Sequence, residues 1–179
     1  MTWFTSAVRA GVRGRSPASL SLRTALAHLW FALNFFLAFP ALVLYASGAS
    51  LRPPPGALAV LGVAVIVLAH VALFFLLVAF VRAGRGTQAP LDPPQELVLR
   101  GVYRWIRNPM YLLYAGIVLG EAMLYRSPAL LAYALAFWLL THLYVVCIEE
   151  RALRRRFGMA YTDYCRRAGR WLPRVRSPG

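Results

Sequence analysis

The chain has 179 residues, of which 60% are hydrophobic, and its 20 basic and 6 acidic residues give a net charge of +14. About half of this length lies in apolar stretches about as long as a bilayer-spanning helix, and the rest is divided among segments too short for a separate soluble catalytic domain of the usual size. All the basic residues are arginines placed at the ends of those stretches, so their charge indicates membrane topology and no nucleic-acid partner. We therefore predict an all-α polytopic membrane bundle whose chemistry is built from helix ends and short loops.

Four apolar stretches are long enough, or nearly so, to cross the bilayer. They cover residues 25–47, 57–81, 109–125 and 128–148. Asn34 and Pro40 interrupt the first stretch, and the third is short, at about 25 Å, and carries Glu121 near its far end. These stretches divide the chain into a basic N-terminal segment (1–24), a first transmembrane hairpin (25–81) and a catalytic, cofactor-binding half (82–179).

The arginines predict the orientation of the bundle. Only Arg52 and Arg126 lie outside three groups, which precede the first stretch, separate the second from the third and follow the fourth. Positive residues favour the cytoplasmic side, so we expect a protein of the bacterial inner membrane with both termini and the central loop on the cytoplasmic side. A cleaved signal peptide ending near Ala46 to Ala49 is the alternative for the first stretch, but that stretch is longer than the usual signal-peptide core.

The third and fourth stretches form a hairpin that brings polar residues to one end. A tight turn at residues 126–127 places residues that are equally distant from it at similar depth. By this count Tyr111 lies level with His142, and Arg104 lies level with Glu149. We therefore expect the start of the third stretch and the acidic end of the fourth to form opposite walls of one cytoplasmic cavity.

The residue types at those two ends indicate a site for a zwitterion. Asn108 and Pro109 fit the N-cap and the first turn of the third helix, whose free N–H groups attract an anion. Glu149 and Glu150 end the fourth helix, where the helix dipole disfavours negative charge, so they need cationic partners. A bound ammonium or the nearby arginines can supply that charge. A set of structural salt bridges is the alternative interpretation.

Of the three histidines, His142 is the candidate for a catalytic role. It lies within the fourth stretch, on roughly the same helix face as Glu149. Histidine inside a membrane segment is often functional, and here it is a candidate proton acceptor. The alternative is a structural histidine hydrogen-bonded to a neighbouring helix.

Other features of this half have structural interpretations. Gly116 and Gly120, four residues apart, predict a close approach between the third helix and a neighbour. Cys147 and Cys165 have neither the number nor the spacing of a metal site or a disulfide framework, so we expect two free thiols.

The segment after the fourth stretch is strongly basic. Leu153 and Phe157, one helical turn apart among arginines, predict a C-terminal amphipathic interfacial helix that ends at Gly158. Three aromatic residues then alternate with arginines, namely Tyr161, Tyr164 and Trp171. This pattern is typical of contact with the headgroups of membrane lipids.

Short motifs follow one another in order from residue 90 to residue 174. They are Asp92-Pro93-Pro94, Gly101-Val102-Tyr103-Arg104, Arg107-Asn108-Pro109-Met110-Tyr111, Glu149-Glu150, Phe157-Gly158-x-x-Tyr161-x-x-Tyr164 and Leu172-Pro173-Arg174. In this order they resemble the isoprenylcysteine carboxyl methyltransferase and phospholipid methyltransferase family. The resemblance implies a compact helical membrane enzyme that holds S-adenosylmethionine at the cytoplasmic face and methylates a lipophilic substrate entering from the bilayer.

The resemblance also implies roles for individual residues. The cofactor would be lined by Leu99, Gly101, Tyr103 and Arg104, walled by Asn108, Pro109 and Tyr111, and held at its polar end by Glu149 and Glu150. The candidates for catalysis are Arg107, Asn108, Tyr111 and His142. The family commonly has His-Pro where this chain has Asn108-Pro109, and asparagine hydrogen-bonds but does not titrate near neutral pH.

The leading hypothesis is therefore an S-adenosylmethionine-dependent membrane methyltransferase. A reductase related to the sterol reductases, which would bind NADPH, and a non-enzymatic membrane scaffold or lipid-binding protein are the alternatives. The acceptor stays open among an isoprenylated cysteine, a phospholipid amine, a quinone-like phenol and a small lipophilic thiol.

Overall fold

The computed structural model describes residue 26, residues 29–84, residue 97 and residues 99–174. The predicted N-terminal segment 1–24, and with it four of the arginines used for orientation, lies outside the described residues, as does most of the stretch before Leu99. The described part is helical and contains no β-strand, so the predicted all-α class is confirmed.

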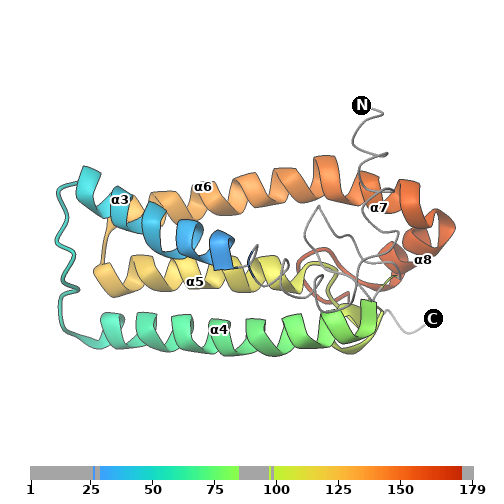
Figure 1. Cartoon of the computed structure of the whole chain (residues 1–179), viewed down its shortest axis with the longest axis horizontal. Helices are drawn as coiled ribbons and strands as arrows, with labels where there is room; N and C mark the ends of the chain where they lie inside the picture. The colour runs from blue at the N-terminus through green and yellow to red at the C-terminus, as the bar shows by residue number, and fades with distance from the viewer. Residues whose placement is uncertain (1–25, 27–28, 85–96, 98, 175–179) are drawn as a thin grey trace.

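Four apolar helical segments lie side by side along the long axis of the molecule (Figure 1). They are the first segment Leu29–Ala46, which contains η1 (Asn34–Ala38) and α3 (Phe39–Ala46), then α4 (Ala57–Gly84), α5 (Pro109–Tyr125) and α6 (Pro128–Tyr144). A π-helical turn, η3 (Val145–Glu149), continues α6 into α7 (Glu150–Phe157), and α8 (Met159–Arg167) follows. By length and composition, Leu29–Ala46, Ala57–Ala79 and Pro128–Phe157 are able to cross a membrane. The shorter α5 has the predicted bounds and packs on both α4 and α6.

The first segment continues through its two predicted interruptions. Pro40 has no N–H to donate, and the helix widens into a π-turn just before it, where the Phe39 N–H bonds to the Asn34 carbonyl five residues back. The Asn34 side chain donates to the Trp30 carbonyl at 2.7 Å. Asn34 and Pro40 therefore change the helical register without ending the helix.

Two glycines determine how closely α4 and α5 approach. A Cβ atom at Gly120 would lie 2.7 Å from Cγ1 of Ile66, and one at Gly62 would lie 2.6 Å from the Gly120 carbonyl oxygen. Gly116 is less constrained, because a Cβ there would meet only the Ala69 methyl at 3.9 Å. The predicted close approach is confirmed at Gly120, which pairs with Gly62 on the neighbouring helix.

The basic segment after α6 folds back on the bundle. The amphipathic stretch is helical as predicted, but α7 prolongs α6 instead of starting a separate helix. The chain then reverses at Gly158, whose φ of +54° favours glycine. As a result, α8 buries Tyr161 and Tyr164 against Leu153 and Phe157. The prediction that these two tyrosines contact lipid headgroups is wrong, because the reversal at Gly158 turns α8 back on the bundle and buries both rings.

Candidate functional site

The polar end of the bundle is formed by the start of α5, the end of α6, and α7 and α8 (Figure 1). Residues 168–174, which we call the C-terminal strap, run beside the loop that precedes α5. Within this pairing the Gly169 N–H donates to the Trp105 carbonyl at 3.0 Å, and the Arg107 N–H donates to the Gly169 carbonyl at 2.8 Å. The strap therefore fixes the backbone from which α5 begins.

Asn108 occupies the predicted N-cap position of α5, and Pro109 follows in the first turn. The side chain of Asn108 does not cap the helix, because its Nδ2 donates to the Arg170 carbonyl of the strap at 3.2 Å. The first turn thus keeps backbone N–H groups that no side chain caps, and such groups attract an anion.

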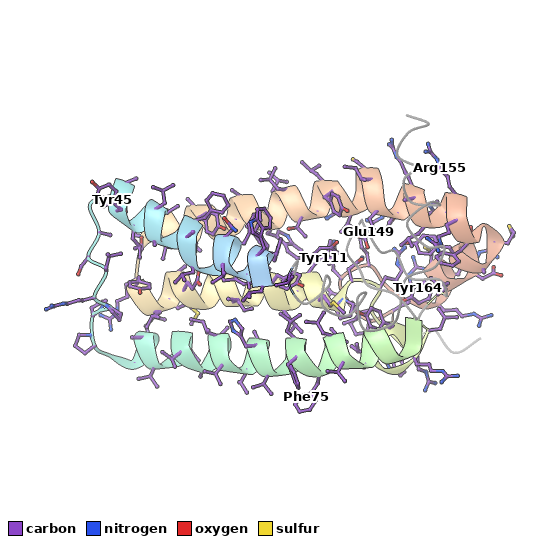
Figure 2. All side chains as sticks on the ribbon, viewed as in Figure 1. Tyr45, Phe75, Tyr111, Glu149, Arg155 and Tyr164 are labelled. Carbon is purple, nitrogen blue, oxygen red and sulfur yellow. The ribbon has the colours of Figure 1, made fainter. Side chains whose placement is uncertain are left out.

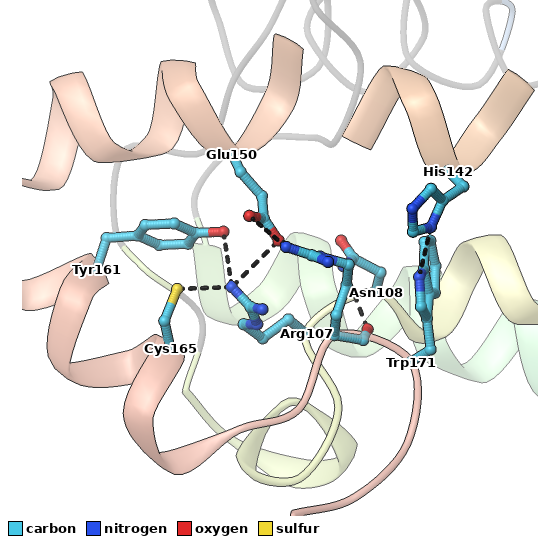
Figure 3. Close-up of polar contacts among 8 residues, drawn as sticks. Arg107, Asn108, His142, Glu150, Tyr161, Cys165 and Trp171 are labelled. Atoms are coloured by element: carbon cyan, nitrogen blue, oxygen red, sulfur yellow. Dashed lines mark hydrogen bonds and ion pairs between the residues drawn. The ribbon is translucent and has the colours of Figure 1, made fainter. Parts of the chain in front are cut away.

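Glu150 forms ion pairs with two arginines, Arg107 and Arg170, and Figure 3 shows its contact with Arg107. Its carboxylate accepts from Nε and Nη2 of Arg170 at 2.7 and 3.1 Å and lies 3.2 Å from Nη1 of Arg107. The side chains of Arg107 and Glu150 are only 8% and 6% exposed. The hydrogen bonds to Glu150 raise the pKa of Arg170, which stays cationic. One buried carboxylate is therefore matched by two guanidinium groups.

Arg107 connects this ion pair to α8. Its Nη1 donates to Sγ of Cys165 at 2.6 Å and to the Tyr161 hydroxyl at 3.5 Å. Burial raises the pKa of Tyr161 and of Tyr164, so both phenols stay neutral, and the Tyr164 hydroxyl donates to the Tyr103 carbonyl at 2.7 Å. Cys165 is a free thiol, as predicted.

Glu149 has a different environment from that of Glu150. Its Oε2 accepts a hydrogen bond from the Tyr111 hydroxyl at 2.8 Å, and the two side chains point toward one another (Figure 2). The start of α5 and the end of α6 therefore lie at the same end of the bundle, and the two walls meet directly through this pair. The carboxylate has a neutral donor here, with no arginine paired to it in the described part of the chain.

The Tyr111 hydroxyl meets Glu149, which lies seven residues or about two turns beyond His142, the residue that the count from the hairpin turn places level with Tyr111. Side chains on a helix lean toward its N-terminus. In the antiparallel pair α5 and α6, Tyr111 therefore leans out toward the polar end, whereas Glu149 leans back toward the turn. Two residues with offset backbones meet in this way.

His142 is bonded to the strap. The indole Nε1 of Trp171 donates to Nδ1 of His142 at 3.0 Å, and the Trp171 ring packs on Trp138 with centroids 4.5 Å apart. Because the indole can only donate, Nδ1 of His142 is the acceptor and the proton of the neutral ring lies on Nε2. Trp171 thus packs against α6, whereas we had expected its side chain to contact lipid headgroups.

The remaining predicted cofactor residues lie at the edge of this end. Leu99 and Arg104 are exposed, Gly101 has a φ of +60°, and Tyr103 is buried. Arg104 forms no ion pair with any residue that the structure describes, so of the nearby arginines that could neutralise the two glutamates it is not one that does.

Sequence reasoning missed the residues of α8 and the strap that complete this end, which are Tyr161, Cys165, Arg170 and Trp171. Their contacts depend on the chain reversal at Gly158, which the local pattern does not predict. Two adjacent carboxylates at a helix C-terminus were the available signal, because they required cations from somewhere in the chain.

Two comparisons with known proteins agree on the class of protein. Residues 57–160, more than half of the chain, match the sequence model of the phospholipid methyltransferase family. The chain is also 35% identical over 78 residues to the protein-S-isoprenylcysteine O-methyltransferase of Tribolium castaneum. That similarity covers 43% of this chain and 27% of the insect protein, so the chain spans about a quarter of this relative's length.

Proposed function

We propose, because this chain belongs to the phospholipid methyltransferase family, that it binds S-adenosylmethionine at the polar end of the bundle and methylates a lipophilic acceptor held in the membrane. The observation that carries the proposal is the contact between Tyr111 at the start of α5 and Glu149 at the end of α6. This contact brings the two halves of the family's motif pattern to one place.

The groups at this end fit the charges of the cofactor. Its ammonium suits a carboxylate, its carboxylate suits the uncapped first turn of α5, and its adenine suits an aromatic wall that includes Tyr111 and Tyr103. Leu99, Gly101 and Arg104 would form the outer rim of the site. When bound, the cofactor supplies an electrophilic methyl group on a sulfonium.

The two glutamates are suited to different tasks. Glu150 already faces Arg107 and Arg170, and a third cation would be repelled by the excess positive charge. Glu149 has only a neutral phenol as a partner, so its negative charge is available to an ammonium. We therefore assign the cofactor contact to Glu149, and we assign to Glu150 the positioning of the strap and of Arg107.

The other catalytic candidates act through this arrangement. Tyr111 orients the Glu149 carboxylate, and Asn108 anchors the strap beside the first turn of α5. In the neutral ring Nε2 carries the proton, so His142 can accept a proton from an amine or phenol only at Nδ1, after Trp171 has moved away from that atom. The main work of the protein is to align donor and acceptor and to exclude water, which together supply several kcal/mol in well-aligned systems.

We also infer that the protein lies in a bacterial inner membrane and that its polar end faces the cytoplasm. Exposed arginines of α7 and α8 gather there, whereas Arg126 lies at the opposite end and donates to the Pro55 carbonyl at 3.2 Å. Positive residues favour the cytoplasmic side. Labelling of a cysteine introduced at Arg155 by an impermeant thiol reagent in spheroplasts and in inverted vesicles tests this orientation.

Calorimetric titration of the purified protein with S-adenosylmethionine tests the function. Glu149→Gln should weaken binding by about tenfold or more, since it removes the charge that pairs with the ammonium. Asp163→Asn is the matched control, because Asp163 is a half-exposed acid of α8 whose ion pair is with Arg166 on the same helix. Failure of the parent to bind, or equal affinities for the parent and Glu149→Gln, would contradict the proposal.

The family description and the insect relative point to different acceptors, a phospholipid and an isoprenylated cysteine. Transfer of radiolabelled methyl groups into a total lipid extract and into an S-farnesylcysteine derivative distinguishes the two. A base-labile labelled product indicates a carboxyl ester, and a base-stable product indicates an amine.

A further inference from the structure

A cavity of about 220 Å³ lies beside the candidate site, within the apolar part of the bundle. The first helical segment, α4 and α5 each contribute to its wall. Its lining includes Phe31, Ala32, Phe36, His70, Leu73 and Tyr114. Nδ1 of His70 is bonded to the Ile66 carbonyl at 2.8 Å, so Nε2 is the ring nitrogen that is left to face the cavity.

We propose that this cavity binds the hydrocarbon chain of the methyl acceptor, and that the first helical segment thereby selects which acceptor is methylated. The inference rests on the proposed function, whose reaction needs a lipophilic acceptor. The inference assigns a role in acceptor binding to the first helical segment, for which the sequence indicated only membrane insertion.

The size and the chemistry of the cavity suit part of a chain. Cavities of about 150 Å³ with apolar walls stay dry and bind benzene, so this larger one can hold several carbons of an acyl or isoprenoid chain. It is smaller than the pocket of roughly 300 Å³ or more that encloses a whole small ligand. Leu29, which also lines the cavity, is 54% exposed, so the rest of the chain can extend past it into the bilayer.

The cavity is adjacent to the candidate site along α5. Tyr114 lies in the cavity wall, and its ring centroid is 6.2 Å from that of Tyr111, one helical turn away. Tyr111 in turn donates its hydroxyl to Glu149. A chain that enters between the first segment and α4 would therefore bring its polar head toward Tyr111 and Glu149.

The wall supplied by the first segment lies outside the matched family region, which covers residues 57–160. This wall is well ordered by aromatic contacts, since the Phe31 and Phe36 rings pack on Tyr114 with centroid distances of 5.1 and 5.5 Å. An element outside the shared region that shapes the path to the shared site is suited to discriminate among acceptors.

Filling the cavity tests this inference. Ala32→Phe places a ring in the lining, and Ala41→Phe adds the same ring to an exposed position of α3 that does not line the cavity. The full chain is placed in phosphatidylcholine vesicles with a palmitoyl probe that carries a diazirine, irradiated and mapped by mass spectrometry. We expect labelling of Leu73 to fall about fivefold or more in Ala32→Phe, relative to labelling of the lipid-facing Leu135 and Leu139, and to stay unchanged in Ala41→Phe.

A second variant covers the case in which Ala32→Phe does not fold. Leu77→Ala enlarges the same cavity and should increase labelling of Leu73. In methyl transfer to an S-farnesylcysteine derivative or to dioleoylphosphatidylethanolamine, Ala32→Phe should raise the KM for whichever acceptor is used about tenfold over Ala41→Phe. Affinity for S-adenosylmethionine should be equal in the two variants.

The outcomes separate the two proposals. Unchanged Leu73 labelling in both Ala32→Phe and Leu77→Ala would show ordinary bilayer lipid at this surface and would overturn the inference. Equal methyl transfer by Ala32→Phe and Ala41→Phe would also overturn it, because the cavity would then not hold the acceptor. Failure of the parent to bind S-adenosylmethionine would instead overturn the proposed function, while the labelling result would still decide whether the cavity binds a chain.

Discussion

The seam between α4 and α5 and the polar end of the bundle are held together by different forces. At the seam, Gly62 and Gly120 allow backbone atoms to approach so closely that a single Cβ would collide. At the polar end, Glu150, Arg107 and the strap are joined by hydrogen bonds and ion pairs. A ligand can replace a hydrogen bond with another, but nothing can replace the close packing of two backbones. The proposed cofactor site lies at this end, where a charged ligand can exchange its own hydrogen bonds for existing ones.

A second contrast lies within the polar end. Glu149 and Glu150 are adjacent, but only Glu150 is paired with arginines. Two successive residues on one helix point in different directions, so one reaches the strap while the other reaches Tyr111. The comparison predicts that neutralising Glu150 mainly destabilises the strap, whereas neutralising Glu149 mainly weakens binding of the proposed cofactor.

The largest expected effect on stability is that of Glu150→Gln. This change leaves the buried Arg107 without a counter-ion, and breaking a buried pair in this way costs about 3–5 kcal/mol. The strap should then detach, making the chain at Arg170 and Arg174 more accessible to trypsin. Limited proteolysis with mass spectrometry measures this directly. Glu149→Gln is the matched control, and equal cleavage of the two variants would show that the glutamates do not differ.

The next effect is that of Gly120→Val, which tests the seam. Overpacking a tight contact costs about 1–3 kcal/mol, and here the new side chain would meet Ile66 and the Gly62 carbonyl. Thermal unfolding in detergent should show a lower midpoint, whereas the strap should stay as resistant to trypsin as in the parent. Gly116→Ala is the control, because its added methyl meets only an ordinary contact. Release of the strap by Gly120→Val would mean that the two regions are coupled.

The same contrast explains how much of the structure could be predicted. The bounds of α5 follow from Pro109 and the turn at Arg126, which are local signals, and the glycine contact follows from residue size. The expectation that Glu149 and Glu150 need cations was correct for Glu150, but Arg170 as a partner depends on where α8 lies after Gly158. The N-cap position of Asn108 was also predictable, whereas its bond to the strap was not. Local patterns thus predict elements, and contacts across the chain reversal decide the site.

The smallest effect expected is that of Trp171→Phe, which separates hydrogen bonding from packing at the strap. Phenylalanine keeps an aromatic ring against Trp138 but cannot donate to Nδ1 of His142, and a lost neutral hydrogen bond costs about 0.5–1.5 kcal/mol. We expect a small decrease in unfolding midpoint, together with a change in the His142 imidazole nitrogen signals in NMR spectra of the selectively labelled protein. Trp171→Ala should also lose the ring packing and release the strap more fully. If Trp171→Phe releases the strap as completely as Glu150→Gln does, the indole bond holds the strap as firmly as the ion pair, and the distinction between ionic and neutral contacts at this end fails.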